Sequence, residues 1–144
     1  MNVYLWDTNV LTHYINGEAT LQAHLQRVAW KEIALPSVVV AEILRGRSEY
    51  ALKAPLEKTA HANILLEETR QLLNNFSVVI FDQSSSGALA RLQKQHRTHK
   101  RHVDLMIAAM AIAGNHVVIT RNQKHFADLL PPRQLMNWID DPPR

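Results

Sequence analysis

The chain has 144 residues, of which 47% are hydrophobic and 20% charged, and this composition is typical of one globular domain that buries roughly two thirds of its unfolded surface. Its formal net charge is +3, so a polyanionic partner is compatible with the charge but not required by it. The sequence has no cysteine, which excludes disulfides and thiolate metal sites, and it shows neither a signal peptide nor the run of about 20 apolar residues of a membrane span, so we expect a cytoplasmic protein.

The first expected element is a short strand near the N-terminus. Strand-favouring residues run from Val3 to Trp6 and stop at Asp7, after which a helical pattern begins near Leu11. Short apolar runs flanked by helices are typical of strands buried on both faces of a parallel sheet. Ligands bind outside the carboxyl ends of such strands, and Asp7 is therefore expected at a ligand-binding edge.

The remaining pattern predicts strands that alternate with helices. Strands are expected at residues 33–35, 77–81, 117–119 and 134–136, and helices at residues 18–30, 37–46, 56–75, 88–96, 104–113 and 123–129. Ser37 is the expected N-cap of the second of these helices, and Gly46 its expected end. The alternation predicts an α/β fold with a mostly parallel central sheet flanked by helices. One domain at residues 1–139 and a flexible tail at residues 140–144 complete the expectation.

Three carboxylates stand out by their surroundings. Asp7 follows a buried strand, Glu42 interrupts an apolar helix, and Asp104 begins a helix that is otherwise almost entirely apolar. Acidic side chains are rarely buried unless they are paired or coordinate a cation. Each also has an ordinary explanation: Asp7 as a turn residue, Glu42 as an ion-pair partner of Arg45 or Arg47, and Asp104 as a helix cap.

Taken together, the three carboxylates predict a metal site. If the strand ends and helix starts face one edge of the sheet, the carboxylates converge there and repel one another unless a cation joins them. Hard oxygen ligands without a thiolate favour Mg²⁺ or Mn²⁺. The Thr8 hydroxyl and the Asn122 amide are expected to orient a bound water or a carboxylate. Histidine ligands from His99, His102 or His125 are the less favoured alternative.

A basic segment leads directly into Asp104. Its members are Arg91, Lys94, Arg97, Lys100 and Arg101, with histidines at 96, 99 and 102. Because such side chains bind phosphates without sequence preference, we expect Lys100 and Arg101 to hold a nucleic-acid backbone beside the metal site. The alternative is a solvated helix face and loop.

These segments resemble the PIN domain family, in the expected order and over nearly the whole chain. The likeness is strongest to VapC-type toxins, the ribonuclease half of type II toxin–antitoxin modules. The matching segments are Asp7-Thr8-Asn9, Ala41-Glu42-Ile43-Leu44-Arg45-Gly46, Asp104-Leu105-Met106-Ile107-Ala108-Ala109-Met110-Ala111, Thr120-Arg121-Asn122, Phe126 and Asn137-Trp138.

The resemblance implies a Mg²⁺- or Mn²⁺-dependent endoribonuclease. Its metal ligands would be Asp7, Glu42 and Asp104, with Asn122 as a further catalytic residue. The expected substrate-binding residues are Thr8, Lys100, Arg101 and Arg121. The family often has a fourth acid in or just after the segment that corresponds to Thr120-Arg121-Asn122, commonly before the phenylalanine. This chain has Asn122 and His125 at those places.

The resemblance also implies an antitoxin partner, an RNA substrate with transfer RNA as a candidate, and a homodimer. A binding module of the same fold that holds RNA or protein with weak or no catalysis is the main alternative function. A phosphatase with Asp7 as nucleophile is a weaker alternative, because Asn9 stands where that chemistry commonly has a second acid.

Overall fold

A parallel sheet runs through the middle of the molecule. The computed structural model describes residues 2–144, and its five strands follow the order β3-β2-β1-β4-β5. Every neighbouring pair is parallel, and Tyr4 of the central strand pairs with Ile33 on one side and Val117 on the other. The strands are β1 (Tyr4–Trp6), β2 (Ile33–Pro36), β3 (Ser77–Val79), β4 (Val117–Ile119) and β5 (Leu135–Met136). The predicted α/β fold with a parallel sheet is confirmed.

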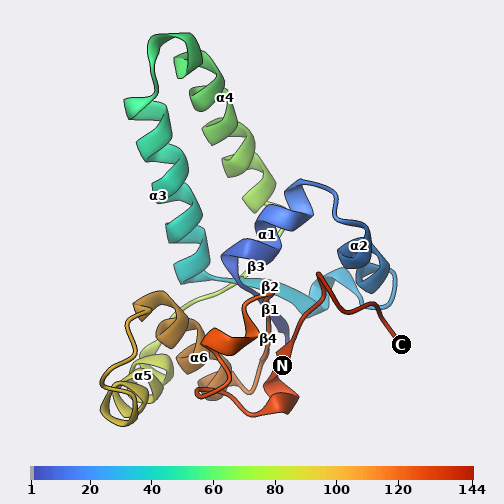
Figure 1. Cartoon of the computed structure of the whole chain (residues 1–144), viewed down its shortest axis with the longest axis vertical. Helices are drawn as coiled ribbons and strands as arrows, with labels where there is room; N and C mark the ends of the chain where they lie inside the picture. Colours follow the sequence, from blue (N-terminus) through green and yellow to red (C-terminus); the bar gives the residue numbers. More distant parts are fainter. Residues whose placement is uncertain (1) are drawn as a thin grey trace.

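Helices lie on both sides of this sheet. They are α1 (Thr8–Ile15), α2 (Ala19–Leu25), α3 (Ser37–Lys53), α4 (Leu56–Leu73), α5 (Gln83–Gln95) and α6 (His102–Gly114), with short 3₁₀ turns η1 (Trp30–Glu32), η2 (Gln123–His125) and η3 (Pro132–Gln134). In Figure 1, α1, α3 and α4 lie above the strands, and α5 and α6 lie below them. No helix in the described chain is long and apolar enough to cross a membrane.

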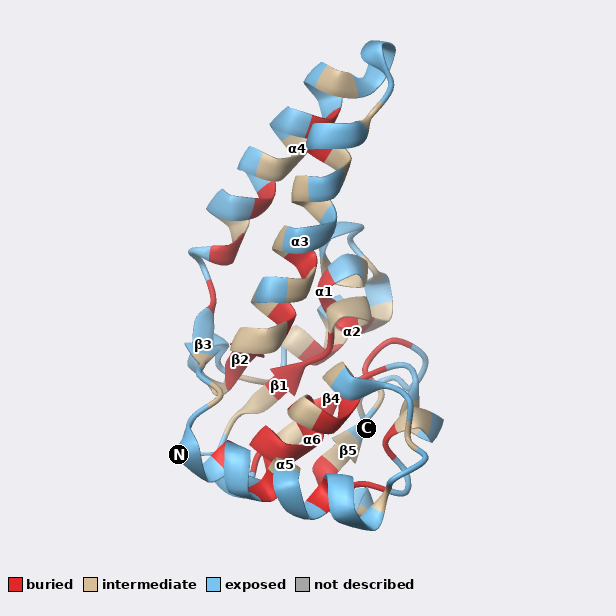
Figure 2. Cartoon of the chain, turned by 90° about the vertical axis from the view of Figure 1, so that its left-hand side faces the viewer, coloured by how far each residue is buried: buried red, intermediate tan, exposed pale blue. Residues whose placement is uncertain are grey.

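The core is centred on β1, β4 and α6. Leu5, Trp6 and Ile119 are fully buried, as expected for strands covered on both faces. Three alanines of α6, Ala108, Ala109 and Ala111, are also fully buried, and their small side chains let α6 lie close to the sheet. Figure 2 shows this concentration of buried residues around the strands and α6, below a mostly exposed pair of helices. The ends of β1 and β4 are therefore held by a tightly packed core.

Helices α3 and α4 form a hairpin that projects from the rest of the molecule (Figure 1). Leu52 and Leu56 near its tip are 85% and 90% exposed. The prediction that Gly46 ends the helix was wrong, because α3 continues through Gly46 to Lys53. A glycine in a helix interior costs only about 1 kcal/mol, and packing against α4 outweighs that cost.

Other predicted boundaries also differ where long-range contacts decide them. Ser37 is not the N-cap of α3 but its first residue, and its hydroxyl accepts a hydrogen bond from the Phe81 amide at 2.9 Å. The helix expected at residues 18–30 ends at Leu25, and Trp30 instead donates its indole N–H to the Asn75 carbonyl at 2.8 Å. The helix expected at residues 123–129 is the single 3₁₀ turn η2.

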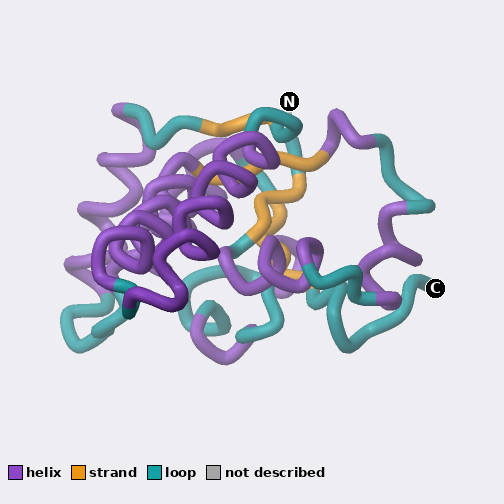
Figure 3. Tube along the Cα trace, turned by 90° about the horizontal axis from the view of Figure 1, so that it is seen from above, coloured by secondary structure: helices purple, strands orange, loops and turns teal. Residues whose placement is uncertain are grey.

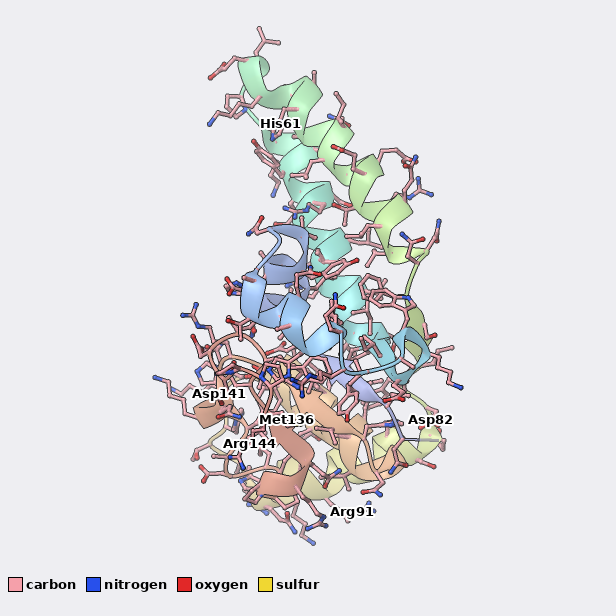
Figure 4. The ribbon with its side chains drawn as sticks, turned by 90° about the vertical axis from the view of Figure 1, so that its right-hand side faces the viewer. His61, Asp82, Arg91, Met136, Asp141 and Arg144 are labelled. Atoms are coloured by element: carbon pink, nitrogen blue, oxygen red, sulfur yellow. The ribbon has the colours of Figure 1, made fainter. Side chains whose placement is uncertain are left out.

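The last residues of the chain contact α2 and the turn after it. The His24 ring nitrogen Nε2 lies 2.5 Å from the Asp141 carbonyl oxygen, and Arg27 donates to the Arg144 carbonyl at 2.7 Å. Figure 4 labels Asp141 and Arg144 on the lower part of the molecule, well away from the hairpin. Seen from above, the C-terminal segment lies beside α2 (Figure 3). A pocket of about 600 Å³ lies between this segment, β5 and α2, and its lining does not include Asp7, Glu42 or Asp104.

Candidate active site

Asp7 lies where β1 ends and α1 begins. Its backbone N–H donates to the Ile119 carbonyl at 3.0 Å, which holds it beside β4. One carboxylate oxygen caps α1 by accepting from the Thr8 amide at 2.8 Å, and the other accepts from the Asn9 amide group and the Thr120 hydroxyl, both at 2.9 Å. Asp7 is therefore the N-cap of α1, a role not predicted from the sequence, and is also a buried carboxylate with a fixed orientation.

Thr120 organises the same edge from the end of β4. Its hydroxyl donates to Asp7 and accepts from the Asn122 amide N–H at 3.0 Å and from the Asn9 side chain at 3.3 Å. The side chain is fully buried. The sequence-based prediction gave no role to Thr120 or Asn9, although one signal was available: Thr120 directly follows a buried strand, as Asp7 does.

Glu42 lies on α3, the helix that follows β2. The Thr8 hydroxyl donates to a Glu42 carboxylate oxygen, so Thr8 joins the segment after Asp7 to α3. Arg47, a suggested partner of Glu42, instead donates to the Thr69 hydroxyl on α4 at 3.2 Å. Glu42 also lines a hollow of about 210 Å³ between α3 and α6. Its carboxylate thus lies at the base of the hairpin, next to α1 and α6.

Asp104 is the third residue of α6, and the N-cap position belongs to Arg101. The cap interpretation of Asp104 was therefore wrong. The residue is 9% exposed, and within residues 2–144 its oxygen Oδ2 is buried without a hydrogen-bond partner. Burial, followed by the charge of Asp7, raises the pKa of Asp104 to about 6, against the opposing charge of Arg101.

The charges of neighbouring carboxylates act on Asp7 and Asp104. Burial raises the pKa of Asp7, and the charge of Glu42 raises it further, while Asp7 and Glu42 both raise the pKa of Asp104. Asp7 and Glu42 therefore lie near enough to Asp104 for their charges to act on its carboxylate. As positioned, however, no three histidine or acidic side chains within residues 2–144 are grouped closely enough to hold a metal ion. The donor chemistry fits a hard divalent cation, since it offers three carboxylates, one of them with an unpartnered buried oxygen.

The expected substrate-binding residues differ in their surroundings. Lys100 and Arg101 are exposed in the segment that leads into α6. Arg121 donates its Nε–H to Asp140 at 3.1 Å, so a phosphate would compete with that carboxylate. Asn122 is exposed, and its backbone N–H is bound by Thr120.

The PIN domain family matches residues 4–129, which is most of the chain. The chain belongs to the PIN domain family. The family assignment made from the sequence is thus confirmed. Comparison with curated proteins returned no match.

Three solved structures with a similar fold illustrate the likeness, and one of them is a toxin–antitoxin complex. The FitAcB structure from Neisseria gonorrhoeae has a TM-score of 0.75 at 25% identity, covering 96% of this chain and 100% of that one. The DNA-bound VapBC structure from Salmonella typhimurium has a TM-score of 0.72 at 18% identity, covering 96% and 99%. A toxin–antitoxin complex from Klebsiella pneumoniae has a TM-score of 0.66 at 22% identity, covering 92% and 94%. The last two likenesses concern the fold alone.

Proposed function

We propose that this PIN domain is a metal-dependent endoribonuclease that hydrolyses RNA phosphodiester bonds and acts as the toxin of a type II toxin–antitoxin module. The observation that carries the proposal is the buried Asp104 oxygen that lacks a hydrogen-bond partner within residues 2–144. Burial and the charges of Asp7 and Glu42 raise the pKa of Asp104, and carboxylates that repel one another need a cation to ionise together. The likeness to FitAcB at 25% identity supports the toxin assignment.

The three carboxylates would hold Mg²⁺ or Mn²⁺. Such an ion, when bound, supplies Lewis-acid stabilisation of the phosphate charge and lowers the pKa of a bound water. The protein contributes preorganisation: Asp7 is oriented by three hydrogen bonds, and Thr8 holds Glu42. Asn122, at the end of β4, is proposed to orient the attacking water through its side-chain amide. Thr120 positions Asp7 and Asn122 without contacting the substrate.

RNA would approach over the basic segment that precedes α6. Lys100 and Arg101 are proposed to bind its phosphates, with further contacts from Thr8 and Arg121. Since phosphate contacts carry no sequence information, the choice of RNA depends on other surfaces. Transfer RNA is the candidate substrate by analogy with similar toxins.

An antitoxin is the proposed protein partner. An arginine side chain from such a partner would neutralise the carboxylate cluster through charge-assisted hydrogen bonds. A homodimer is also proposed, with the exposed apolar side chains of the α3–α4 hairpin as a candidate surface. Light scattering of the purified chain tests this proposal, and a monomer at micromolar concentration contradicts it.

A binding module without turnover is the second candidate. It is favoured by the lack, within residues 2–144, of three suitably close metal-binding side chains. Calorimetric titration with Mg²⁺ or Mn²⁺ followed by a turnover assay separates the two functions, because the binding module predicts RNA affinity without cleavage.

The deciding experiment is RNA cleavage by the purified protein. Cleavage should stop in chelator and return with Mg²⁺ or Mn²⁺. The double variant Asp7→Asn, Asp104→Asn should lose at least 100-fold in rate, whereas Glu57→Gln on the exposed face of α4 should leave the rate unchanged. A fully active double variant would show that the carboxylates are not the catalytic site.

A further inference from the structure

His125 is held in a defined position at the end of the turn η2. This turn follows Asn122 and is closed by a hydrogen bond from the His125 amide to the Asn122 carbonyl at 3.0 Å. The next residue, Phe126, is fully buried and donates its amide N–H to the Gln123 carbonyl, also at 3.0 Å. The His125 backbone is thus fixed between the end of β4 and a core aromatic side chain.

A second contact ties this turn to the segment before α6. The Arg101 amide donates to His99 Nδ1 at 3.3 Å, which makes Nδ1 an acceptor and leaves the proton on Nε2. His99 Nε2, 3.2 Å from the His125 carbonyl oxygen, therefore donates to it. Through His99, the turn that carries His125 and the start of the helix that carries Asp104 are held together.

This arrangement places the His125 ring beside Asp104. His125 Nδ1 lies 3.8 Å from Asp104 Oδ2, the buried oxygen that lacks a hydrogen-bond partner within residues 2–144. The separation is too long for a hydrogen bond. It is shorter than about 4.2 Å, the largest separation of two atoms that each lie about 2.1 Å from one cation. A single cation can therefore bind both atoms.

We propose that His125 Nδ1 is a ligand of the same cation as Asp104, and that this nitrogen makes the site selective for Mn²⁺ over Mg²⁺. The inference rests on the proposed function, since it concerns the same metal site. Imidazole nitrogen suits first-row transition metals, whereas Mg²⁺ takes oxygen ligands almost exclusively, and Mn²⁺ accepts both. A site of carboxylates plus one imidazole thus discriminates against Mg²⁺.

Metal binding by His125 requires the neutral form of its ring. Neutral imidazole is the form that binds metals. The opposing interpretation is a simple ion pair between a protonated His125 and Asp104, in which the ring contributes nothing to metal binding.

Calorimetric titration with Mn²⁺ and Mg²⁺ tests the selectivity. The unmodified protein should bind Mn²⁺ at least tenfold more tightly than Mg²⁺. His125→Ala should lose at least tenfold in Mn²⁺ affinity with little change for Mg²⁺, and His125→Asp should gain affinity for Mg²⁺. His61→Ala is the matched control, because His61 lies on the projecting hairpin away from the sheet edge (Figure 4), and its affinities should match the unmodified protein.

Pulsed electron paramagnetic resonance of the Mn²⁺-loaded protein supplies a readout that does not depend on activity. Coupling to ¹⁴N should be present in the unmodified protein and in His61→Ala, and absent in His125→Ala and His125→Asp. If Mn²⁺ binds without ¹⁴N coupling, and with equal affinity in His125→Ala, His125 is not a ligand, while the proposed nuclease function stands. If neither cation binds to the unmodified protein, both proposals fail.

Discussion

Thr120 is the residue on which the geometry of the sheet edge depends most. Its buried hydroxyl is shared by Asp7, Asn9 and the Asn122 backbone, so it joins the segment after β1 to the segment after β4. A hydroxyl suits this place because it donates to a carboxylate and accepts from N–H groups at the same time. An isosteric apolar side chain would leave the Asp7 carboxylate and two donors without this partner.

Replacing Thr120 with valine should therefore destabilise the protein by about 1–3 kcal/mol, the cost of unsatisfied buried polar groups. Urea unfolding measures the change. Thr12→Val is the matched control, since the Thr12 hydroxyl only bonds to the Thr8 carbonyl on an exposed face of α1, and its effect should stay within about 0.5 kcal/mol. Equal effects of the two substitutions would mean that the Thr120 network contributes little.

The carboxylate of Asp104 predicts a dependence of stability on pH. Its pKa of about 6 lies above the ordinary value of 3.8, so the folded protein binds the proton more tightly than the unfolded chain does. In chelator, this residue should therefore lower stability progressively as pH rises from about 4 to above 6. Asp104→Asn should remove the penalty and stabilise the metal-free protein by about 1–3 kcal/mol at pH 7.

Thermal unfolding in chelator at pH 4 to 8 measures this effect as the difference between the unmodified protein and Asp104→Asn. Taking the difference cancels the other titrating groups. The difference should shrink to about 0.5 kcal/mol near pH 4, and added Mn²⁺ should stabilise the unmodified protein but not the variant. A variant no more stable than the parent at pH 7 would show that the Asp104 charge is already compensated.

At the scale of elements, the sequence predicted best what local pattern determines. The β-branched run at residues 117–119 is β4, and the long amphipathic stretch from residue 56 is α4. Boundaries were predicted less well where a cap or a distant contact decides them. The helix expected at residue 88 begins at Gln83, because Asp82 accepts from the Ser85 amide at 2.9 Å and lowers the energy of an earlier start.

From the sequence, the topology could be used to predict which segments meet at the sheet edge, but not which side chains contact one another there. Placing Asp7, Glu42 and Asp104 at one edge needs only parallel strands and helices that return between them. The contacts of Thr120, or of His99 with the His125 carbonyl, join segments whose relative positions depend on packing. Residue types alone do not show which of several histidines faces a carboxylate.

Gly46 tests how much the hairpin depends on helix propensity. An added Cβ at this position meets no atom within 4 Å, so Gly46→Ala should stabilise the protein by about 0.5–1 kcal/mol by removing backbone freedom from the unfolded chain. Gly17→Ala should do the opposite even though its Cβ also meets open space, because Gly17 has a φ of +72°. Urea unfolding compares the two, and a destabilising Gly46→Ala would contradict this account of α3.

At the scale of the whole molecule, two groups of basic side chains lie far apart along the long axis. Exposed lysines such as Lys53, the last residue of α3, and Lys58, near the start of α4, lie at the tip of the hairpin, whereas Lys100 and Arg101 directly precede α6. The hairpin tip and α6 lie far apart in the molecule (Figure 1). If overall charge attracted RNA, lysines at either end would contribute equally. If a local phosphate site attracts it, only the pair near Asp104 matters.

The double variants Lys100→Ala, Arg101→Ala and Lys53→Ala, Lys58→Ala distinguish these possibilities, since each removes two positive charges from a formal net charge of +3. RNA affinity is measured in chelator, where no cleavage occurs, over a range of salt concentrations. The first variant should bind more weakly, and its plot of log affinity against log salt should be shallower by about 1.4 for two lost contacts to single-stranded RNA. The second should keep the parent slope, because its charges lie at the hairpin tip. Equal slopes for the two variants would assign RNA attraction to the overall charge and remove Lys100 and Arg101 from the proposed substrate site.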